Sequence, residues 1–429
     1  MKTLFLCLLA LAQFTAFNTL KAQSYTSWFT GDEADTTTVT QPGIVLMGGA
    51  GEHDNAMRWF LERANGGDVV VIRASGSDGY NDYLFSDLGV EVNSVQTILF
   101  NTPSASINPY VIEQLFNAEA IWIAGGDQYD YISYWQGTAV EDAINNLINV
   151  KGGPVGGISA GMAVLCGNYF SAQNGSAQSD VVLNNPFHST IQLGDNDFLE
   201  VPYLSNVVTD THYDDPDRRG RHATFLARKY VDTGNPTFGI ACDEYAAVSI
   251  DENGQARVWG DAPNYDDYVY FIRPNCDVGL PEFCEEGEAL TWNYNGLALA
   301  VLRFNSIDDG SDWFDLNNWV DHQGGEWLAW SVIAGNLQEV PTVAPDCSVG
   351  IERTIAKELH VYPNPSAGFV HVDGVFGPME LSVYSNDGRK VKTFNLTENQ
   401  NRIDLSELTE GTYIIKWDGG SEVIQRIGK

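Results

Sequence analysis

Short, fully apolar runs without polar alternation recur between residues 44 and 248. In the first half of the chain, two stretches at 55–64 and 109–118 separate these runs and carry apolar residues at helical spacing. A strand that is apolar on both faces is usually buried on both faces. The pattern therefore predicts an α/β fold with a mostly parallel sheet covered by helices on both faces. The apolar runs are residues 44–47, 69–72, 120–124, 207–209 and 246–248.

Two glycine pairs, at 48–49 and 125–126, directly follow predicted strands. Tight turns that need the conformational freedom of glycine explain the pairs themselves. They do not explain why the polar Asp127 and Gln128 come next. Because the working residues of such sheets lie at the carboxyl ends of the strands, we expect a site at this edge.

The first 23 residues have the pattern of a secretory signal peptide. Lys2 precedes an apolar run at residues 4–12, and Ala22 offers a small residue for cleavage. The run is too short for a transmembrane helix. A buried N-terminal helix is the alternative interpretation of this segment.

The pattern changes again near the C-terminus. Residues 341–357 are rich in turn formers, which indicates a linker after a main domain at residues 24–340. In residues 358–429, short alternating runs are separated by turn residues. This predicts a small all-β sandwich, and it contains no cluster of catalytic residue types.

Charge excludes two classes of partner. The 429 residues include 57 Asp and Glu against 23 Lys and Arg, a net charge of −34. An acidic surface repels nucleic-acid phosphates and anionic membranes, so neither is an expected partner. The body of the chain has no apolar stretch long enough to span a membrane. The sequence does not indicate an oligomeric state.

An exported, oxidising context permits disulfides, and the cysteine spacing does not favour a structural zinc site. Cys276 and Cys284 lie close together in an acidic loop and are candidates for a disulfide. Cys166 and Cys242 lie in apolar runs, which favours buried thiols. Because the chain has no Cys-x-x-Cys pair and no EF-hand spacing, the sequence identifies no metal ligands and no cofactor.

Residues 157–161 match G-x-S-x-G, the pattern that places a nucleophilic serine on a strained turn from strand to helix. An apolar strand precedes the motif, and residues 162–165 continue it as a helix. The flanking glycines let the backbone bend, and the helix N-terminus favours developing negative charge. Ser159 is therefore the candidate nucleophile.

A serine nucleophile needs a base, and the base needs an orienting acid. His212 follows the predicted strand at 207–209, so it is favoured over His53 and His188. Glu244 follows an apolar run in the same way and is the favoured acid. The rival acids are Asp243 and Asp210. The chain order Ser, His, Glu differs from that of α/β-hydrolases, which counts against a lipase or esterase.

Taken together, these segments resemble cyanophycinase and the wider group of aspartyl dipeptidase-like serine peptidases. The resemblance covers about residues 42–304. The segments that carry it are residues 46–52, 123–128, 157–161, 210–213, 239–244 and 289–296.

The resemblance implies a flavodoxin-like α/β fold and hydrolysis through a Ser-His-Glu triad. In the cyanophycinases the substrate is a β-linked aspartyl-arginine polymer. The implied roles are Ser159 as nucleophile, His212 as base, Glu244 as orienting acid, the N–H groups of Gly126 and Ala160 as oxyanion donors, and Gln128 as a substrate contact.

The sequence departs from the family pattern after the histidine. Arg219 and Arg221 keep two of three expected arginines, and Thr224 stands at the third position. We expect the two arginines, with Asp210 of the same region, to form the substrate-binding part of the site. Because a guanidinium fork suits a carboxylate, the expected substrate has an acidic or β-aspartyl group on the acyl side. Surface salt bridges to nearby acids are the alternative.

The C-terminal sandwich resembles the sorting domain of the type IX secretion system. The resemblance rests on residues 361–365, Gly368, residues 408–413 and the terminal Gly428 and Lys429. It implies an encounter with the type IX secretion machinery and a secreted or cell-surface location.

These observations predict an exported serine peptidase that cleaves aspartyl or β-aspartyl peptide bonds. A catalytically inactive, surface-displayed binding protein on the same fold is the main alternative. An ester hydrolase on an α/β-hydrolase fold is a weaker one because of the triad order.

Overall fold

The computed structural model describes residues 23–276, 278–305, 307–345, 347, 360–373, 379–386, 389–396, 402–417 and 420–427. The chain divides into two compact units, residues 1–345 and 346–429. Residues 1–22, on which the predicted signal peptide falls, lie outside the described residues.

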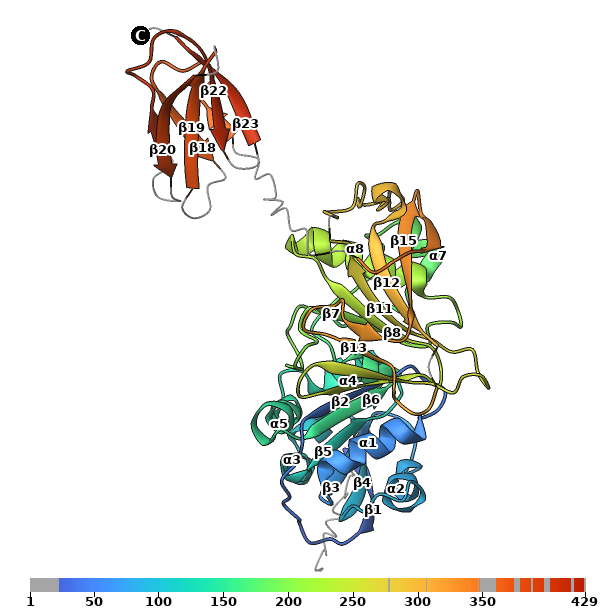
Figure 1. Ribbon diagram of the computed structural model, residues 1–429. Helices are drawn as coiled ribbons and strands as arrows, with labels where there is room; N and C mark the ends of the chain where they lie inside the picture. The colour runs from blue at the N-terminus through green and yellow to red at the C-terminus, as the bar shows by residue number, and fades with distance from the viewer. Residues whose placement is uncertain are drawn as a thin grey trace, which may run out of the picture. The chain divides into compact units, whose positions relative to one another are not determined.

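A ten-stranded sheet organises the first half of unit one (Figure 1). Its centre is a block of neighbouring parallel strands, which includes the predicted runs at 44–47, 69–72 and 120–124 and the strand predicted before the serine motif. The strand at 94–100, also in this block, was not predicted. Antiparallel strands extend the sheet on both sides. In sheet order the strands are β1 (Tyr25–Gly31), β4 (Ser94–Phe100), β3 (Asp68–Arg73), β5 (Ala120–Ile123), β6 (Pro154–Ile158), β2 (Gly43–Met47), β9 (Ala247–Asp251), β10 (Gln255–Trp259), β13 (Trp313–Asp315) and β14 (His322–Gln323).

Helices cover both faces of this sheet. Alternate residues along a strand pack in two separate apolar clusters, one on each face. Val69 and Val71 of β3 pack in the cluster that includes α1 (Asp54–Ala64). Val70 and Ile72 pack in the cluster that includes α3, α4 and α5. The bounds of these three helices are Pro109–Asn117, Gln128–Trp135 and Ala139–Asn146. The predicted helices at 55–64 and 109–118 and the predicted fold class are confirmed.

A second sheet, which the sequence pattern did not indicate, forms the other half of unit one (Figure 1). Only β7 and β8 pair in parallel, and the remaining pairs are antiparallel. Its order is β16 (Asn336–Pro341), β15 (Glu326–Ile333), β12 (Leu299–Phe304), β11 (Val269–Pro274), β8 (Phe238–Cys242) and β7 (Val207–Asp210). The helix α8 (Arg219–Thr233) packs Phe225 and Leu226 into the apolar cluster of this sheet.

The predicted runs at 207–209 and 246–248 are strands, but they do not extend the parallel block. β7 lies in the second sheet, and β9 pairs with β2 in antiparallel orientation. A strand buried on both faces has the same apolar pattern in either orientation, so the pattern cannot assign its sheet.

Unit two is an all-β region of two antiparallel sheets, as predicted. Apolar residues of both sheets, among them Val370, Val383 and Ile415, share one core. One sheet holds β17 (His360–Tyr362), β18 (Phe369–Asp373) and β21 (Arg402–Asp404). The other holds β20 (Lys390–Leu396), β19 (Met379–Ser385), β22 (Gly411–Trp417) and β23 (Gly420–Arg426).

The predicted Cys276–Cys284 disulfide is wrong. Cys284 is a free thiol buried in the cluster of the second sheet, so it forms no disulfide with Cys276, which is itself disulfide-bonded. The predicted buried thiols Cys166 and Cys242 are confirmed. The described residues include no helix with the length and apolar character needed to cross a membrane.

Candidate active site

Ser159 stands between β6 and the short helix α6 (Ala160–Ala163) in a strained backbone conformation, with φ 54° and ψ −116°. Two glycines make this turn possible. A Cβ atom on Gly157 would lie 2.5 Å from the carbonyl carbon of Gly161, and one on Gly161 would lie 2.0 Å from the carbonyl oxygen of Ile123. The G-x-S-x-G pattern thus has its expected strand–turn–helix setting.

His212 follows β7, and its ring meets the serine hydroxyl. The distance from Ser159 Oγ to His212 Nε2 is 2.8 Å. The backbone N–H of His212 donates to the carbonyl of Gly48 at 3.0 Å. A Cβ on Gly49 would lie 2.2 Å from Cε1 of the imidazole ring. The first glycine pair therefore provides both a tether and the space for the ring.

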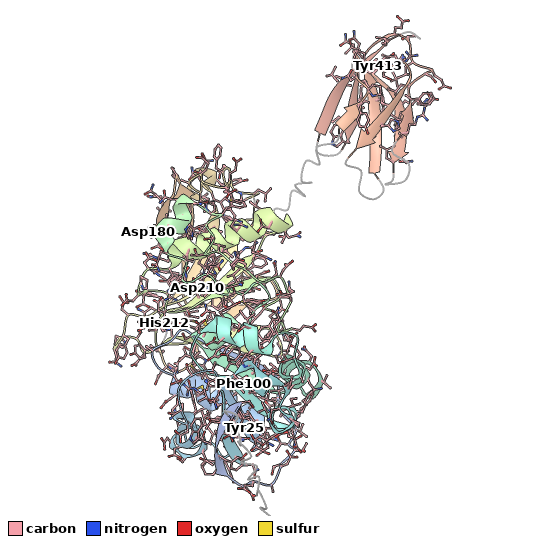
Figure 2. The ribbon with its side chains drawn as sticks, turned by 180° about the vertical axis from the view of Figure 1, so that it is seen from behind. Tyr25, Phe100, Asp180, Asp210, His212 and Tyr413 are labelled. Carbon is pink, nitrogen blue, oxygen red and sulfur yellow. The ribbon has the colours of Figure 1, made fainter. Side chains whose placement is uncertain are left out.

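Glu244 completes the arrangement from the turn after β8. Its Oε1 lies 2.6 Å from His212 Nδ1. Because a carboxylate oxygen accepts, Nδ1 carries the proton, and Nε2 is left to accept the serine proton. The three side chains come from one strand of the first sheet and two strands of the second. His212 lies in the middle of unit one (Figure 2).

The rival acids have other partners. Asp243 accepts from the backbone N–H of Tyr268 at 2.8 Å, and Asp210 forms an ion pair with Arg221. Burial raises the pKa of Asp243 to about 8, and the neighbouring charges of Asp214 and Asp267 add to the rise. Among the three candidate acids, Glu244 has the hydrogen bond to the base.

The rival histidines also lie elsewhere. His53 Nε2 is 3.1 Å from the carbonyl of Gly260, and it is the N-cap of α1. His188 Nδ1 is 2.9 Å from the hydroxyl of Thr190. Their contacts are those of structural side chains that fix loops.

Of the two backbone groups expected to hold an oxyanion, Ala160 directly follows the serine, and Gly126 follows a glycine that lies beside it. Ala160 is the first residue of α6, so its N–H has no partner within the helix. A Cβ on Gly125 would lie 3.6 Å from Cβ of Ser159, which puts the second glycine pair next to the nucleophile. The Tyr131 hydroxyl donates to the carbonyls of Ala124 and Gly125 and fixes this turn.

Gln128 begins α4 directly after this turn. Its side-chain amide is half-buried, and Nε2 lies 3.4 Å from the carbonyl of Phe170. This long contact ties the start of α4 to the segment 170–177, which runs along the same side of unit one.

Both candidate arginines are already engaged within the protein. Arg221 is 4 % exposed, and its Nε donates to Asp210 Oδ2 at 2.8 Å. Arg219 forms a forked pair with Asp217 and also contacts Glu339. Arg219 therefore forms the surface salt bridges of the alternative interpretation, whereas the ion pair of Arg221 with Asp210 is buried.

The charge and hydrogen bonds of Arg221 affect the pKa of Asp210 more strongly than burial does. Burial alone would raise the pKa of Asp210, but the guanidinium charge and its hydrogen bonds hold that pKa below its usual value. Asp210 is therefore ionised, and it is 3 % exposed. Neither member of this pair presents an open polar face.

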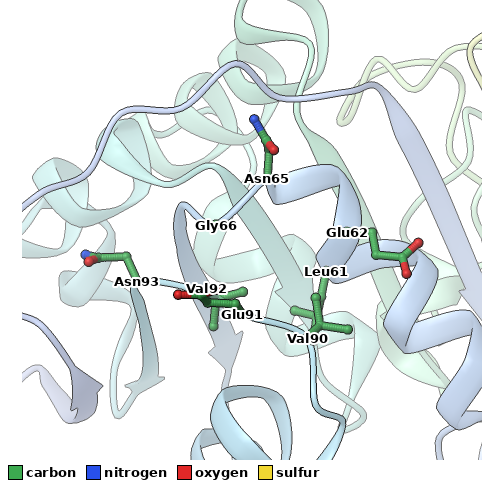
Figure 3. A pocket seen from close by; sticks show the side chains of 8 residues that line it. All are labelled: Leu61, Glu62, Asn65, Gly66, Val90, Glu91, Val92 and Asn93. Atoms are coloured by element: carbon green, nitrogen blue, oxygen red, sulfur yellow. The ribbon is translucent and has the colours of Figure 1, made fainter.

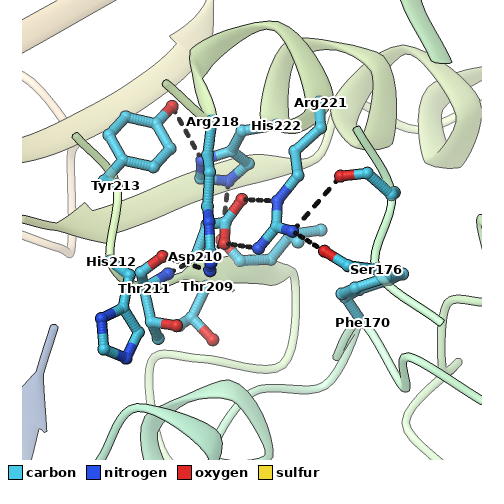
Figure 4. Close-up of polar contacts among 12 residues, drawn as sticks. Phe170, Ser176, Thr209, Asp210, Thr211, His212, Tyr213, Arg218, Arg221 and His222 are labelled. Carbon is cyan, nitrogen blue, oxygen red and sulfur yellow. Dashed lines mark hydrogen bonds and ion pairs between the residues drawn. The ribbon is translucent and has the colours of Figure 1, made fainter. Parts of the chain in front are cut away.

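Two residues that the sequence interpretation missed lie behind the base. Arg218 Nη1 donates to the carbonyl of Thr211 at 2.8 Å, and His222 contacts Tyr213 and Val208 (Figure 4). Arg218, Arg221 and His222 share one face at the start of α8, which is the spacing of i, i+3 and i+4. This spacing is the sequence signal that could have identified Arg218 and His222, because it places three polar side chains next to the end of β7.

A hollow of about 500 Å³, shown in Figure 3, is lined by none of these residues. It is formed by the end of α1, including Leu61 and Asn65, and by the segment with Val92 and Asn93 that leads into β4. This is the amino-terminal edge of the parallel strands, whereas the triad lies at their carboxyl edge. Among the described residues, no group of three or more His, Cys, Asp and Glu is placed to hold a metal ion.

Comparison with known proteins identifies both units. Residues 77–257, which include Ser159, His212 and Glu244, match the model of peptidase family S51. This part of the chain is therefore similar to peptidase family S51. Residues 360–427 match the secretion system C-terminal sorting domain. That domain marks the protein for the type IX secretion machinery, so the peptidase is exported to the cell surface or the medium.

Solved structures of two peptidases are similar to this chain. One is a peptidase from an acI-B1 Actinobacterium, with 18% identity, a TM-score of 0.40, and coverage of 54% of this chain and 91% of the other. The second is a putative peptidase E from Listeria monocytogenes EGD-e, with 14% identity, a TM-score of 0.33, and coverage of 51% and 98%. The comparison with curated protein sequences finds no match.

Proposed function

We propose that this protein is a serine peptidase of family S51 that cleaves aspartyl or β-aspartyl peptide bonds outside the cell. The observation that carries the proposal is the continuous hydrogen-bond chain from Ser159 Oγ through His212 to Glu244, with distances of 2.8 and 2.6 Å. A nucleophile, a base and an orienting acid in this order are the requirements of acyl transfer.

The first half of the reaction forms an acyl-enzyme. Ser159 Oγ attacks the scissile carbonyl carbon while its proton passes to His212 Nε2. Glu244 keeps the imidazole oriented and stabilises the imidazolium that forms. The backbone N–H groups of Gly126 and Ala160 donate to the developing oxyanion. His212 then gives the proton to the leaving amine.

The second half repeats these roles with water. His212 accepts a proton from a water molecule, and the resulting hydroxide attacks the acyl carbon. When the tetrahedral intermediate collapses, Ser159 leaves as its alcohol by regaining the proton. At the end of the cycle, each residue has returned to its starting protonation and covalent state.

The aspartyl preference rests on the resemblance of the motifs to the aspartyl dipeptidase-like peptidases. Gln128, at the start of α4, is a proposed substrate contact. Arg219 is half-buried and held by Asp217, so a substrate carboxylate would compete with that pair. The intact hydrogen-bond chain counts against an inactive binding protein.

A panel of dipeptides tests this function. Wild-type enzyme and the Ser159→Ala variant are assayed on β-aspartyl, α-aspartyl and matched neutral dipeptides. We expect cleavage of aspartyl substrates by the wild type and none by the variant. Cleavage of neutral peptides only would refute the substrate class, and equal cleavage by the variant would refute the triad.

A further inference from the structure

A buried ion pair stands directly behind the proposed catalytic base. Asp210 ends β7, two residues before His212, and Arg221 reaches it from the first turns of α8 (Figure 4). Nε and Nη2 of Arg221 donate to the two carboxylate oxygens of Asp210, and the two side chains are 4 and 3 % exposed. This forked geometry is the strongest form of such a pair.

The same helix face fixes the backbone on both sides of Asp210. Arg218 Nη1 donates to the carbonyl of Thr211 at 2.8 Å. His222 Nε2 lies 3.1 Å from the carbonyl of Val208, and its Nδ1 lies 3.2 Å from the Tyr213 hydroxyl. The start of α8 therefore holds the segment 208–213 before and after the base.

The protonation state of His222 follows from its partners. A carbonyl only accepts, so Nε2 must carry a proton, and Nδ1 accepts from the Tyr213 hydroxyl. Desolvation by complete burial lowers the pKa of His222 to about 4, which agrees with a neutral ring. His222 is thus a fixed structural imidazole that supports the segment carrying His212.

His212 needs this support because its backbone is strained. Its φ is 44°, in the left-handed region that a non-glycine residue enters at a cost in free energy. Such a conformation persists only where surrounding contacts determine it. The contacts are the backbone bond from His212 to Gly48 on one side and the α8 side chains on the other.

Arg221 also contacts a second segment of the chain, residues 170–177. Its Nη1 lies 3.1 Å from the Ser176 hydroxyl and 3.4 Å from the Ala177 carbonyl. Those residues belong to the segment 170–177, whose Phe170 carbonyl contacts Gln128. One guanidinium therefore joins the segment that carries His212 to the segment that contacts the proposed substrate residue.

We propose that Arg221 and Asp210 are positioning residues that fix His212 and the segment 170–177 for catalysis, and that Arg221 does not bind a substrate carboxylate. The proposal rests on the proposed role of His212 as base. A substrate carboxylate would have to displace Asp210 and leave a buried charge without its partner, which is strongly unfavourable.

The test uses Arg221→Lys and a probe without a carboxylate. A fluorophosphonate reacts with Ser159 through the same base but offers no carboxylate, so its labelling rate from pH 6 to 9 reports on the triad without a contribution from carboxylate binding. We expect labelling to slow by about tenfold or more while still reaching one adduct per chain. We also expect kcat to fall by a similar factor on aspartyl and neutral dipeptides, with KM for the aspartyl substrate changed by less than about threefold.

Two results would overturn the proposal. Unchanged labelling with a raised KM for aspartyl substrates only would make Arg221 a substrate ligand. A lower final extent of labelling at an unchanged rate would make it a folding residue alone. If wild-type enzyme is not labelled at all, the proposed function fails instead, and the two failures are thereby distinguished.

The Asp210→Asn variant gives an independent test, because the positioning role and the substrate-binding role predict different changes in the affinity for aspartyl substrates. It keeps the shape of the side chain but removes the charge that occupies Arg221. The positioning role predicts a lower kcat with no gain in affinity. A substrate-binding role predicts a lower KM for aspartyl substrates, because the guanidinium becomes available. Arg228→Gln is the matched control, since Arg228 lies on the same helix, pairs with Asp232 and is expected to keep wild-type rates.

Discussion

At the residue scale, we expect the proposed triad to act as a unit. Ser159→Ala removes one oxygen at a turn that glycines shape, so the fold should persist. Peptidase activity should fall by about a thousandfold or more. His212→Ala should lose nearly as much, and the double variant should lose little more than either single one. Single-turnover assays with circular dichroism as a folding control check this, and multiplicative losses in the double variant would contradict a shared mechanism.

The raised pKa of Asp243 predicts how the free energy of unfolding depends on pH. Its side chain is 2 % exposed, and its Oδ1 has no hydrogen-bond partner among the described residues. Because the folded state raises its pKa to about 8 from 3.8, folding takes up a proton between those values. Stability conferred by the protonated group is therefore lost as pH rises, by up to about 1.4 kcal/mol per pH unit.

The pH range that separates the effect of Asp243 on stability from that of His222 lies above pH 6.5. The pKa of His222 is lowered from 6.5 to about 4, which gives the opposite slope below 6.5. We expect Asp243→Asn to remove the fall in unfolding free energy between pH 6.5 and 8, measured by urea denaturation. Asp35→Asn, at an exposed carboxylate, should keep the wild-type slope. Parallel slopes for Asp243→Asn and wild type would refute a proton held by Asp243.

At the element scale, the turn after β2 is built around the base. Gly49 has φ 145°, and a methyl group there would overlap the ring of His212. Gly49→Ala should displace the imidazole and lower kcat by about a hundredfold, the cost of an ångström-scale misplacement. Gly79→Ala is the control, because φ there is −56° and a Cβ would meet nothing within 4 Å. Steady-state kinetics with thermal melts would contradict this if the two variants behaved alike.

The sequence predicted the elements better than their assembly. The apolar runs located the central strands, and the G-x-S-x-G spacing located the turn of Ser159. It could not assign β7 and β8 to a second sheet, because buried strands look alike in either orientation. For the same reason it could not tell whether Arg221 faces solvent or a buried Asp210, since that depends on how α8 packs on β7.

At the scale of the whole molecule, the two units serve one exported enzyme. The sorting domain at 360–427 directs export, and the apolar core of unit one is formed without it. Deleting residues 358–429 should therefore leave active peptidase in the periplasm. Cell fractionation with a dipeptide assay checks this, and active enzyme in the medium from the truncated chain would contradict it.

The mature extracellular form should lack both ends. We expect an N-terminus near Gln23 and a C-terminus before about Leu359, as determined by intact-mass and terminal-peptide mass spectrometry. The removed segments are the predicted signal peptide and the sorting domain. Extracellular protein that retains Lys429 would show that the sorting domain is not cleaved.

The most direct test of the account is to locate the nucleophile chemically. Purified wild-type enzyme is treated with a fluorophosphonate, digested and mapped by tandem mass spectrometry. The hydrogen-bond chain from Ser159 through His212 to Glu244 predicts one adduct on Ser159, none in Ser159→Ala and strongly slowed labelling in His212→Ala. An active enzyme that gives no adduct, or an adduct on another residue, would contradict the proposed catalytic triad.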